Sequence, residues 1–303
     1  MVEGEVSAAG AGIRGGPEKQ ILIPKIKLVE EDNMPEPIII TKQMIEQTFD
    51  DSAKSYDSVG PNVFTQFGRR LVDRLPLVPG ANVLDIATGK GAVLIPTAQR
   101  VGSNGHVVGI DLSRAILQET ERILRESNLT NVKLRRMDAE QLEFPDQTFD
   151  FVICAFALFL FPDIKAALRE MNRVCKPEGY FGFTFFGKPL FNPGIPALVQ
   201  QFMLYGYELR MPQPLAYTPD EVKALLSQFD SVETYTEMND IIYTSLEDIW
   251  SFLLTLPIRS PIMSMNEDVR TRFKNEYFAK ISSIGRADGF HVTMPVIYAI
   301  AKR

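Results

Sequence analysis

Short apolar runs alternate with amphipathic stretches through most of the chain. Apolar residues that recur every three or four positions predict helices, whereas short continuous apolar runs predict buried strands. Five strands are predicted at residues 81–87, 105–113, 131–139, 150–158 and 179–187. Helices are predicted at residues 41–59, 62–75, 91–101, 114–127 and 164–175. Strands and helices that alternate at this spacing are typical of a parallel, doubly wound sheet.

The second half of the chain adds two strands and further helices. Residues 232–238 and 291–303 predict strands, which brings the expected sheet to seven. Thr218, with Glu221 three residues later, predicts a capped helix start. Helices are predicted at residues 218–229, 245–257 and 266–284. The predicted fold class is therefore α/β, a doubly wound, Rossmann-like sheet of seven mostly parallel strands.

The pattern predicts one α/β domain preceded by an arm. Residues 1–40 are irregular and contain prolines, which favours a flexible N-terminal arm, and residues 41–187 form the core with its leading helices. Residues 188–303 are expected to complete the same domain. Two stretches, 188–217 and 245–285, are predicted insertions at the carboxyl edge of the sheet, where ligands bind in open α/β folds. We expect these insertions to form a cap over a substrate.

Composition and charge remove several classes of function. The net charge of −6 argues against a broad nucleic-acid-binding face. Cys154 and Cys175 are too few for a disulfide framework and are expected to be buried in a reduced, cytoplasmic protein. His106 and His291 stand alone, so no metal site is predicted. The apolar runs are too short to span a bilayer, and the acidic start does not resemble a secretory signal.

The turn after the first predicted strand reads VLDIATGKG. Ala87, Gly89 and Gly91 allow the backbone to pass close to a ligand, in front of a helix N-terminus that favours negative charge. Asp85 lies at the end of the strand, just before this turn. A carboxylate there would repel a pyrophosphate but suits a ligand with an ammonium group. A nicotinamide oxidoreductase, which needs the phosphate fingerprint, is therefore disfavoured.

Acidic residues also follow the next two strands. Asp111 ends the second strand, where a carboxylate can accept hydrogen bonds from both hydroxyls of a ribose. Asp138 and Ala139 end the third strand, where a carboxylate can accept from an adenine amino group. Any one of these residues could be a cap or a turn former. At the ends of three successive strands they together predict a nucleoside site.

Four segments carry a family resemblance: VLDIATGKG, VVGIDLS, MDAEQLEFPDQTFDFV and MNRVCKPEGYF. In order, they resemble the motifs of class I S-adenosylmethionine-dependent methyltransferases. They are most similar to the ubiquinone and menaquinone biosynthesis branch (methyltransferase type 11), which includes natural-product enzymes. The resemblance covers residues 46–187 and implies S-adenosylmethionine as cofactor and S-adenosylhomocysteine as product.

The resemblance also implies a set of cofactor-binding residues. Tyr56, in a segment similar to the family's N-terminal one, would cover the methionine end of the cofactor. Asp111 and Leu112 would hold the ribose, Asp138 and Ala139 the adenine. Cys154 and Phe156 would line the sulfonium side. The methionine portion would be held in the first turn by Asp85, Ala87, Thr88, Gly89 and Gly91.

One departure from the family constrains the mechanism. Many relatives place His, Asn or Arg near the transferred methyl group, but this chain has FALFLFPD there, with Phe159 and Leu160 at the corresponding positions. Any base must therefore come from elsewhere. His291 and Tyr207 are the predicted catalytic candidates, and a structural role for His291 is the competing interpretation. The wider set of candidate bases is His291, Tyr205, Tyr207, Tyr243 and Glu208, whereas His106 is expected at the surface.

The sequence thus predicts methyl transfer to an oxygen or carbon of a small, largely apolar metabolite, of aromatic, prenylated or polyketide-like character. The alternative is a cofactor-binding protein of the same fold that steers a non-methylating reaction such as cyclisation. Methylation of nucleic acid or protein is disfavoured by the acidic charge and by CAFA in place of an Asn-Pro-Pro-Tyr-type motif. We expect a small-molecule substrate, no nucleic-acid partner and no stable membrane insertion, and a homo-oligomer stays open.

Overall fold

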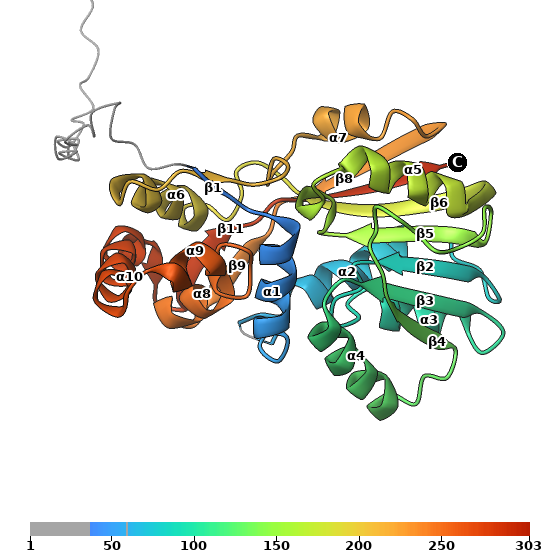
Figure 1. Cartoon of the computed structure of the whole chain (residues 1–303), viewed down its shortest axis with the longest axis horizontal. Helices are drawn as coiled ribbons and strands as arrows, with labels where there is room; N and C mark the ends of the chain where they lie inside the picture. The colour runs from blue at the N-terminus through green and yellow to red at the C-terminus, as the bar shows by residue number, and fades with distance from the viewer. Residues whose placement is uncertain (1–36, 59) are drawn as a thin grey trace, which may run out of the picture. The chain divides into compact units, whose positions relative to one another are not determined.

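A computed structural model describes residues 37–58 and 60–303 (Figure 1). Most of the predicted flexible arm, residues 1–40, lies outside the described residues. The first described elements are a two-residue strand, β1, and the helix α1 (Lys42–Ser52). The helix is shorter than the predicted 41–59, because the chain turns after Ser52 and bonds within the segment 52–58.

A seven-stranded sheet forms the centre of the fold, as predicted. Its strand order is β4-β3-β2-β5-β6-β12-β8. The first five of these strands pair in parallel, whereas β12 is antiparallel to both β6 and β8. The strands are β2 (Asn82–Ile86), β3 (His106–Asp111), β4 (Val132–Arg136), β5 (Phe149–Ala155), β6 (Cys175–Phe186), β8 (Ser231–Glu237) and β12 (Val296–Lys302).

The strand order reverses at β2, which pairs with β3 on one side and with β5 on the other. Such a reversal leaves a crevice at the carboxyl ends of the strands, because the connections on the two sides lead away to opposite faces. The helices that pack on the sheet are α2 (Val63–Arg74), α3 (Leu94–Val101), α4 (Arg114–Glu126), α5 (Ile164–Val174) and α7 (Pro219–Leu225).

Side chains define where several of these helices begin. Thr218 and Glu221 form the predicted capping box of α7. Asn62 precedes α2 without a capping hydrogen bond from its side chain. Asp57 supplies that cap instead, since its carboxylate accepts from the backbone N–H groups of Phe64 (3.1 Å) and Thr65 (2.9 Å). The turn that carries Asp57 is thereby fixed to α2.

Four helices and a small sheet lie outside the central sheet, and we call this group the cap (Figure 1). Its helices fall within the predicted insertions 188–217 and 245–285, whereas β9 and β11 of its small sheet lie outside those ranges. The three-stranded sheet has the order β10-β11-β9, and β1 pairs with β7. The cap helices are α6 (Gly194–Leu204), α8 (Leu246–Leu253), α9 (Arg259–Ser264) and α10 (Glu267–Ile281). The short strands are β1 (Ile38–Ile39), β7 (Leu209–Arg210), β9 (Asp240–Tyr243), β10 (Gly285–Arg286) and β11 (Gly289–Thr293).

The prediction of one closing strand over 291–303 was wrong. The segment divides into β11 and β12, which belong to different sheets. Met294 and Pro295 lie between them. Proline has no N–H to give to a sheet, and here its carbonyl accepts from Gly187 instead, at 2.7 Å. His291 therefore lies in the cap sheet and not in the central one.

Within the described part of the chain, no helix combines the length and the apolar character needed to cross a bilayer.

Candidate functional site

Three adjoining hollows lie at the carboxyl edge of β2, β3 and β5. The polar cleft is lined by residues that include Tyr56, Gly89, Asp111, Leu112, Asp138 and Ala139. The turn pocket lies beside it and includes Tyr56, Asp57, Asp85, Thr88, Lys90 and Phe156. The apolar cavity is lined by residues that include Phe159, Phe186, Leu190, Leu198, Phe252 and Ile258. Tyr56 and Phe156 line all three hollows and so mark their common boundary.

The turn after β2 is held in an unusual backbone conformation. Gly89 and Gly91 have φ values of +53° and +86°, which suit glycine. Ala87 also takes φ +53°, and Phe156, across the pocket, takes +51°. Left-handed backbone costs an L-residue roughly 1–2 kcal/mol. The surrounding contacts therefore impose these conformations at the edge of the site.

The glycine turn passes beside the ring of Tyr56 at Gly89. A Cβ added at this position would lie 3.4 Å from the ring of Tyr56, at the mouth of the polar cleft. The Tyr56 ring is itself held between two aromatic rings, edge-on to Phe49 at 5.4 Å and stacked on Phe64 at 5.3 Å between centroids. Burial raises the pKa of Tyr56 well above its usual value, so the hydroxyl keeps its proton.

Two carboxylates lie on either side of the glycine turn. Asp85 is buried and accepts a hydrogen bond from the Thr88 hydroxyl at 2.6 Å. Burial raises its pKa to about 7, and the nearby charge of Asp111 adds to the rise. Burial likewise raises the pKa of Asp111 to about 6. Two carboxyls that are destabilised in their charged form are prepared to meet a cation or hydroxyl donors.

Asp111 also connects two segments of the site. Its carboxylate accepts from the backbone N–H of Gly89 and of Ser113, both at 3.0 Å. The turn after β2 and the loop after β3 are therefore fixed relative to each other.

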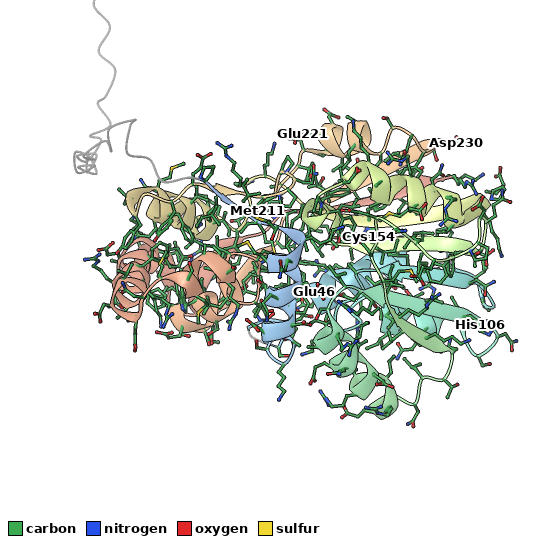
Figure 2. The ribbon with its side chains drawn as sticks, in the orientation of Figure 1. Glu46, His106, Cys154, Met211, Glu221 and Asp230 are labelled. Atoms are coloured by element: carbon green, nitrogen blue, oxygen red, sulfur yellow. The ribbon has the colours of Figure 1, made fainter. Side chains whose placement is uncertain are left out.

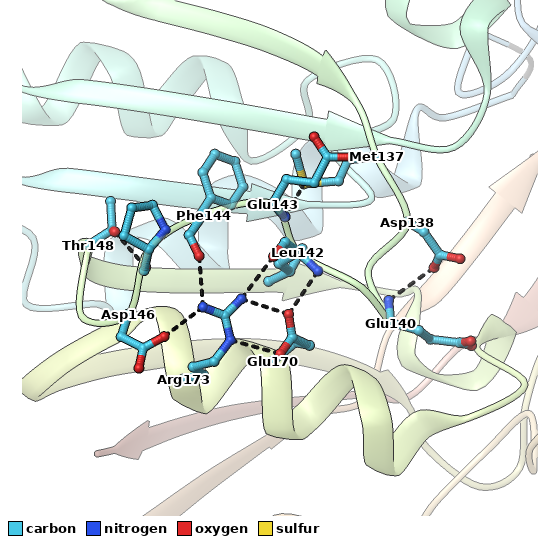
Figure 3. Close-up of polar contacts among 11 residues, drawn as sticks. Met137, Asp138, Glu140, Leu142, Glu143, Phe144, Asp146, Thr148, Glu170 and Arg173 are labelled. Carbon is cyan, nitrogen blue, oxygen red and sulfur yellow. Dashed lines mark hydrogen bonds and ion pairs between the residues drawn. The ribbon is translucent and has the colours of Figure 1, made fainter.

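Asp138 has a partner that the sequence did not reveal. Lys42, on α1, lies 2.8 Å from Asp138 and 2.5 Å from Glu140, and it lines the polar cleft. The loop that carries Asp138 is anchored from behind by Arg173, which donates to the carbonyls of Leu142 and Phe144 (Figure 3).

The polar face of α1 contributes two further contacts to the cleft. Glu46, labelled in Figure 2, pairs with Arg136 at 2.5 Å. Asp50 accepts from the Ser113 hydroxyl at 2.5 Å and from the Ala115 N–H at 3.1 Å. Together with Lys42 these residues are spaced four apart, which places them on one face of a helix. The i, i+4, i+8 spacing was the available sequence signal, but the partners lie far away in the chain.

The apolar cavity has a volume of about 140 Å³, larger than the polar cleft at about 90 Å³. Phe159 and Leu160, the positions where the family resemblance leads one to expect polar groups, both line it. Phe156 and Phe186 pack against each other in its wall, with their ring centroids 4.7 Å apart. Of the described residues that line this cavity, Tyr56 alone carries a hydroxyl group and the rest are apolar.

Two predicted cofactor residues lie outside the linings of the three hollows. Cys154 is fully buried within β5 (Figure 2), and its neighbour Ala155 lines the polar cleft and turn pocket instead. Side chains alternate between faces along a strand, so the two neighbours point in opposite directions. Gly91 lies in the turn, where its N–H donates to the carbonyl of Thr88, but it does not line a hollow.

The candidate bases lie elsewhere. His291 is clamped between Asp240 (2.7 Å) and Asp288 (2.9 Å) in the cap. In the described structure neither His291 nor the other four candidates are among the residues that line the hollows. The predicted roles of His291 and Tyr207 as bases therefore gain no support from geometry, and His106 is exposed, as expected.

The other candidates have structural contacts of their own. Tyr205 donates to Glu276 at 3.0 Å, and Glu208 pairs with Arg210 at 2.9 Å. Tyr243 is buried behind the rings of Phe191 and Phe252. Tyr207 packs edge-on to Phe202.

A family described as a methyltransferase domain matches residues 83–179. Aklanonic acid methyltransferase DauC from Streptomyces sp. (strain C5) is 39% identical over 162 residues, 53% of this chain and 72% of that protein. Nocamycin O-methyltransferase from Saccharothrix syringae is 38% identical over 136 residues, 45% of this chain. The match spans 49% of the nocamycin enzyme, about half its length.

Among solved structures, the crystal structure of the [4+2]-cyclase SpnF matches with a TM-score of 0.56. The match covers 88% of this chain and 97% of that chain at 17% sequence identity, and at that identity it shows the fold alone.

Proposed function

The chain belongs to the class I S-adenosylmethionine-dependent methyltransferases, and from this membership we propose that it methylates a small, polyketide-like or aromatic metabolite in the apolar cavity. The activity is methyl transfer from S-adenosylmethionine, since both named relatives are methyltransferases and the likeness to the cyclase is one of fold alone. The apolar cavity beside the polar cleft is the observation that carries the proposed acceptor class.

The chemistry of the polar cleft and the turn pocket fits S-adenosylmethionine. Asp85 would meet the ammonium of its methionine portion, because a buried carboxyl with a raised pKa gains most from a cation. Asp111 and Leu112 would hold the ribose, and Asp138 and Ala139 the adenine. Ala87, Thr88 and Gly89 would form the floor of the methionine end, and Tyr56 its cover. Ala155 takes the place proposed for Cys154, and Gly91 serves the turn.

The proposed acceptor is apolar because its cavity is. Pockets for small molecules bind apolar surface with few polar groups, and those few fix the orientation. Phe159, Phe186 and Phe252 offer flat surfaces that suit an aromatic or polycyclic ligand. The relatives methylate, by their names, aklanonic acid and nocamycin, which is consistent with such an acceptor here.

Catalysis is proposed to rest on positioning. When bound, S-adenosylmethionine would supply a methyl group on a cationic sulfonium, from which the neutral thioether of S-adenosylhomocysteine is an excellent leaving group. Tyr56 and Phe156, at the boundary of the three hollows, would align the acceptor and exclude water. Near-attack alignment can contribute up to roughly 7–11 kcal/mol in favourable systems. An acceptor oxygen or carbon that ionises readily needs no strong base from the protein.

The cellular location, the partner and the oligomeric state are also proposals. A reduced, cytoplasmic location is supported by two buried cysteine thiols, whose pKa values burial raises. A small molecule, and not nucleic acid, is the proposed partner because of the net charge of −6. A homo-oligomer is compatible with the fold, and sedimentation velocity would measure it.

The first test is calorimetric titration with S-adenosylmethionine and, separately, S-adenosylhomocysteine. Micromolar binding of both is the expected result. A panel of aromatic, prenylated and polyketide acceptors is then incubated with methyl-labelled S-adenosylmethionine, and label in an extracted product identifies the acceptor class. Transfer only to hydrophilic acceptors, in a protein that binds the cofactor, would refute the proposed acceptor class.

A further inference from the structure

We infer that Lys90 is the cationic partner of the methionine carboxylate of S-adenosylmethionine, paired across the turn pocket with Asp85 as the partner of the ammonium. The inference rests on the proposed cofactor site. It gives a role to a residue that is absent from the set implied by the family resemblance. It concerns recognition of the amino-acid end only. Lys90 is thus proposed as a binding residue and not as a catalytic one.

The turn pocket contains few ionisable side chains. Of the described residues that line it, Asp57, Asp85, Lys90 and Tyr56 are ionisable. The carboxylate of Asp57 already accepts from two backbone N–H groups of α2 and from the Thr65 hydroxyl at 2.6 Å. Asp85 and Lys90 remain as the charged pair of opposite sign. A ligand with an ammonium and a carboxylate on one carbon matches such a pair.

The ammonium of Lys90 is held by neutral oxygens. Its Nζ donates to the Ser58 hydroxyl at 2.6 Å and to the carbonyl of Lys54 at 3.2 Å. In the described structure no carboxylate lies within ion-pair distance of it. An ammonium has three donors, so the two contacts leave one for an anion. A bound carboxylate would supply the missing counter-charge.

Its surroundings favour an anion further. Desolvation lowers the pKa of Lys90, and the charges of Glu119 and Asp57 offset this effect only in part. Lys90 also lies in the turn that leads into α3, and the N-terminus of a helix attracts negative charge. The same side chain ties the glycine turn to the segment 54–58, which carries Tyr56. A structural role must therefore be separated from the binding role.

The test compares three ligands by calorimetry: S-adenosylhomocysteine, its decarboxylated analogue and 5′-methylthioadenosine, which lacks the amino-acid end. We expect the wild type to bind S-adenosylhomocysteine at least about tenfold more tightly than the decarboxylated analogue. A tenfold difference in affinity corresponds to one charge-assisted contact of modest strength. Lys90→Met is expected to remove that preference, and Lys90→Arg to retain most of it. Affinity for 5′-methylthioadenosine is expected to stay unchanged in both variants.

Two controls address the structural role. Ser58→Ala removes a partner of Lys90 without removing the charge, and Lys54→Met removes an exposed neighbouring ammonium while its carbonyl stays. Both are expected to keep the preference for the carboxylate-bearing ligand.

The outcomes separate the two proposals. Equal wild-type affinity for S-adenosylhomocysteine and its decarboxylated analogue overturns the role of Lys90 without any variant. An equal loss of affinity for both ligands in Lys90→Met also overturns this role, because the side chain would then only hold the segment 54–58. A wild-type protein that binds none of the three ligands would instead overturn the proposed cofactor site, and this inference with it.

Discussion

The carboxylate of Asp111 accepts a hydrogen bond from the backbone N–H of Gly89, with 3.0 Å between Oδ2 and the nitrogen. The residue that would bind the ribose thus also holds the turn that would bind the methionine portion. Its other oxygen accepts from Ser113 at the start of α4, so one side chain connects the turn after β2 to the loop after β3. This arrangement makes Asp111 the most informative position for testing the cofactor assignment.

Asp111→Ala is expected to weaken binding of S-adenosylmethionine at least tenfold, about 1.4 kcal/mol. The variant loses the proposed ribose acceptor and leaves the Gly89 N–H without its present partner. Calorimetric titration measures the affinity, and circular dichroism checks the fold. Asp111→Asn is the companion variant, because it keeps an acceptor but removes the charge. A folded Asp111→Ala protein with wild-type affinity would refute the ribose assignment.

Cofactor affinity is expected to rise with pH between 5.5 and 8. Burial raises the pKa of Asp85 to about 7 and that of Asp111 to about 6, so both are largely protonated at pH 5.5. The ammonium group of the ligand favours the charged carboxylates, and binding at low pH must first release the protons of these carboxyls. The affinity for S-adenosylhomocysteine should therefore be at least about tenfold lower at pH 5.5 than at pH 8.

The same pKa shifts make the unliganded protein less stable as the pH rises. A carboxyl whose folded pKa lies above its ordinary value of 3.8 contributes stability below that value, and this is lost as the pH rises through about 6 and 7. The rise in Tm on adding ligand should consequently grow with pH. Asp85→Asn should flatten the part of the profile near pH 7. A wild-type affinity that does not change with pH would contradict both shifts.

The sequence predicted the central sheet well because its inner strands β2, β5, β6 and β12 are mostly buried on both faces. Within β5 (Phe149–Ala155), residues 151–155 form a continuous apolar run, which marks the strand in the sequence. Where a strand forms only because it pairs with a distant segment, the local pattern of apolar residues did not predict it. The two-residue strand β1 exists because Ile38 pairs with Leu209, far along the chain. In the closing segment, apolar residues on both sides of Pro295 concealed the change of sheet.

The same distinction applies to the site. Asp85, Gly89 and Asp111 lie at or just after strand ends, so the topology brings them together once the sheet order is known. The pairing of Lys42 with Asp138 joins residues 96 positions apart and depends on how α1 docks. Side chains alternate between the two faces of a strand, so only one of Cys154 and Ala155 can face the site. The sequence did not show which one, because a continuous apolar run gives no sign of which face each residue takes.

Asp50→Ala is expected to speed the release of S-adenosylhomocysteine and to lower the stability of the protein by about 1–3 kcal/mol. Asp50 accepts from the Ser113 hydroxyl and the Ala115 N–H, and so fastens α1 to the start of α4. Stopped-flow displacement measures release, and chemical denaturation measures stability. Asp51→Ala is the matched control. Asp51 is the exposed neighbour of Asp50 on α1, and its carboxylate accepts from Gln47 of the same helix at 2.8 Å and lies 3.8 Å from Arg259. Similar effects of the two variants would argue against a specific role for Asp50.

Phe159→His is expected to leave cofactor affinity intact while it changes acceptor turnover. Phe159 lines the apolar cavity and packs on Phe186 at 5.5 Å, but it is not among the residues that line the polar cleft. A polar ring there changes the wall that faces the acceptor, whereas Phe159→Leu keeps the wall apolar and serves as control. Titration with S-adenosylhomocysteine and label transfer to the identified acceptor separate the two effects. Loss of cofactor binding in a folded Phe159→His protein would show that this side chain borders the cofactor after all.

His291→Gln is expected to keep methyl transfer and to lower Tm more at pH 6 than at pH 9. Hydrogen bonds that His291 donates to Asp288 and Asp240 raise its pKa, so the protonated ring bonds to both carboxylates and joins β11 to β9. A raised histidine pKa contributes stability below the ordinary value of 6.5 and loses it as the pH rises through the folded value. Glutamine can replace one of these bonds but not the charge. His106→Gln, at an exposed position, is the control and should change neither Tm nor turnover. If His291→Gln instead abolished turnover at unchanged Tm, His291 would have to reach the acceptor, and the clamp between Asp240 and Asp288 would be a resting position of a catalytic base.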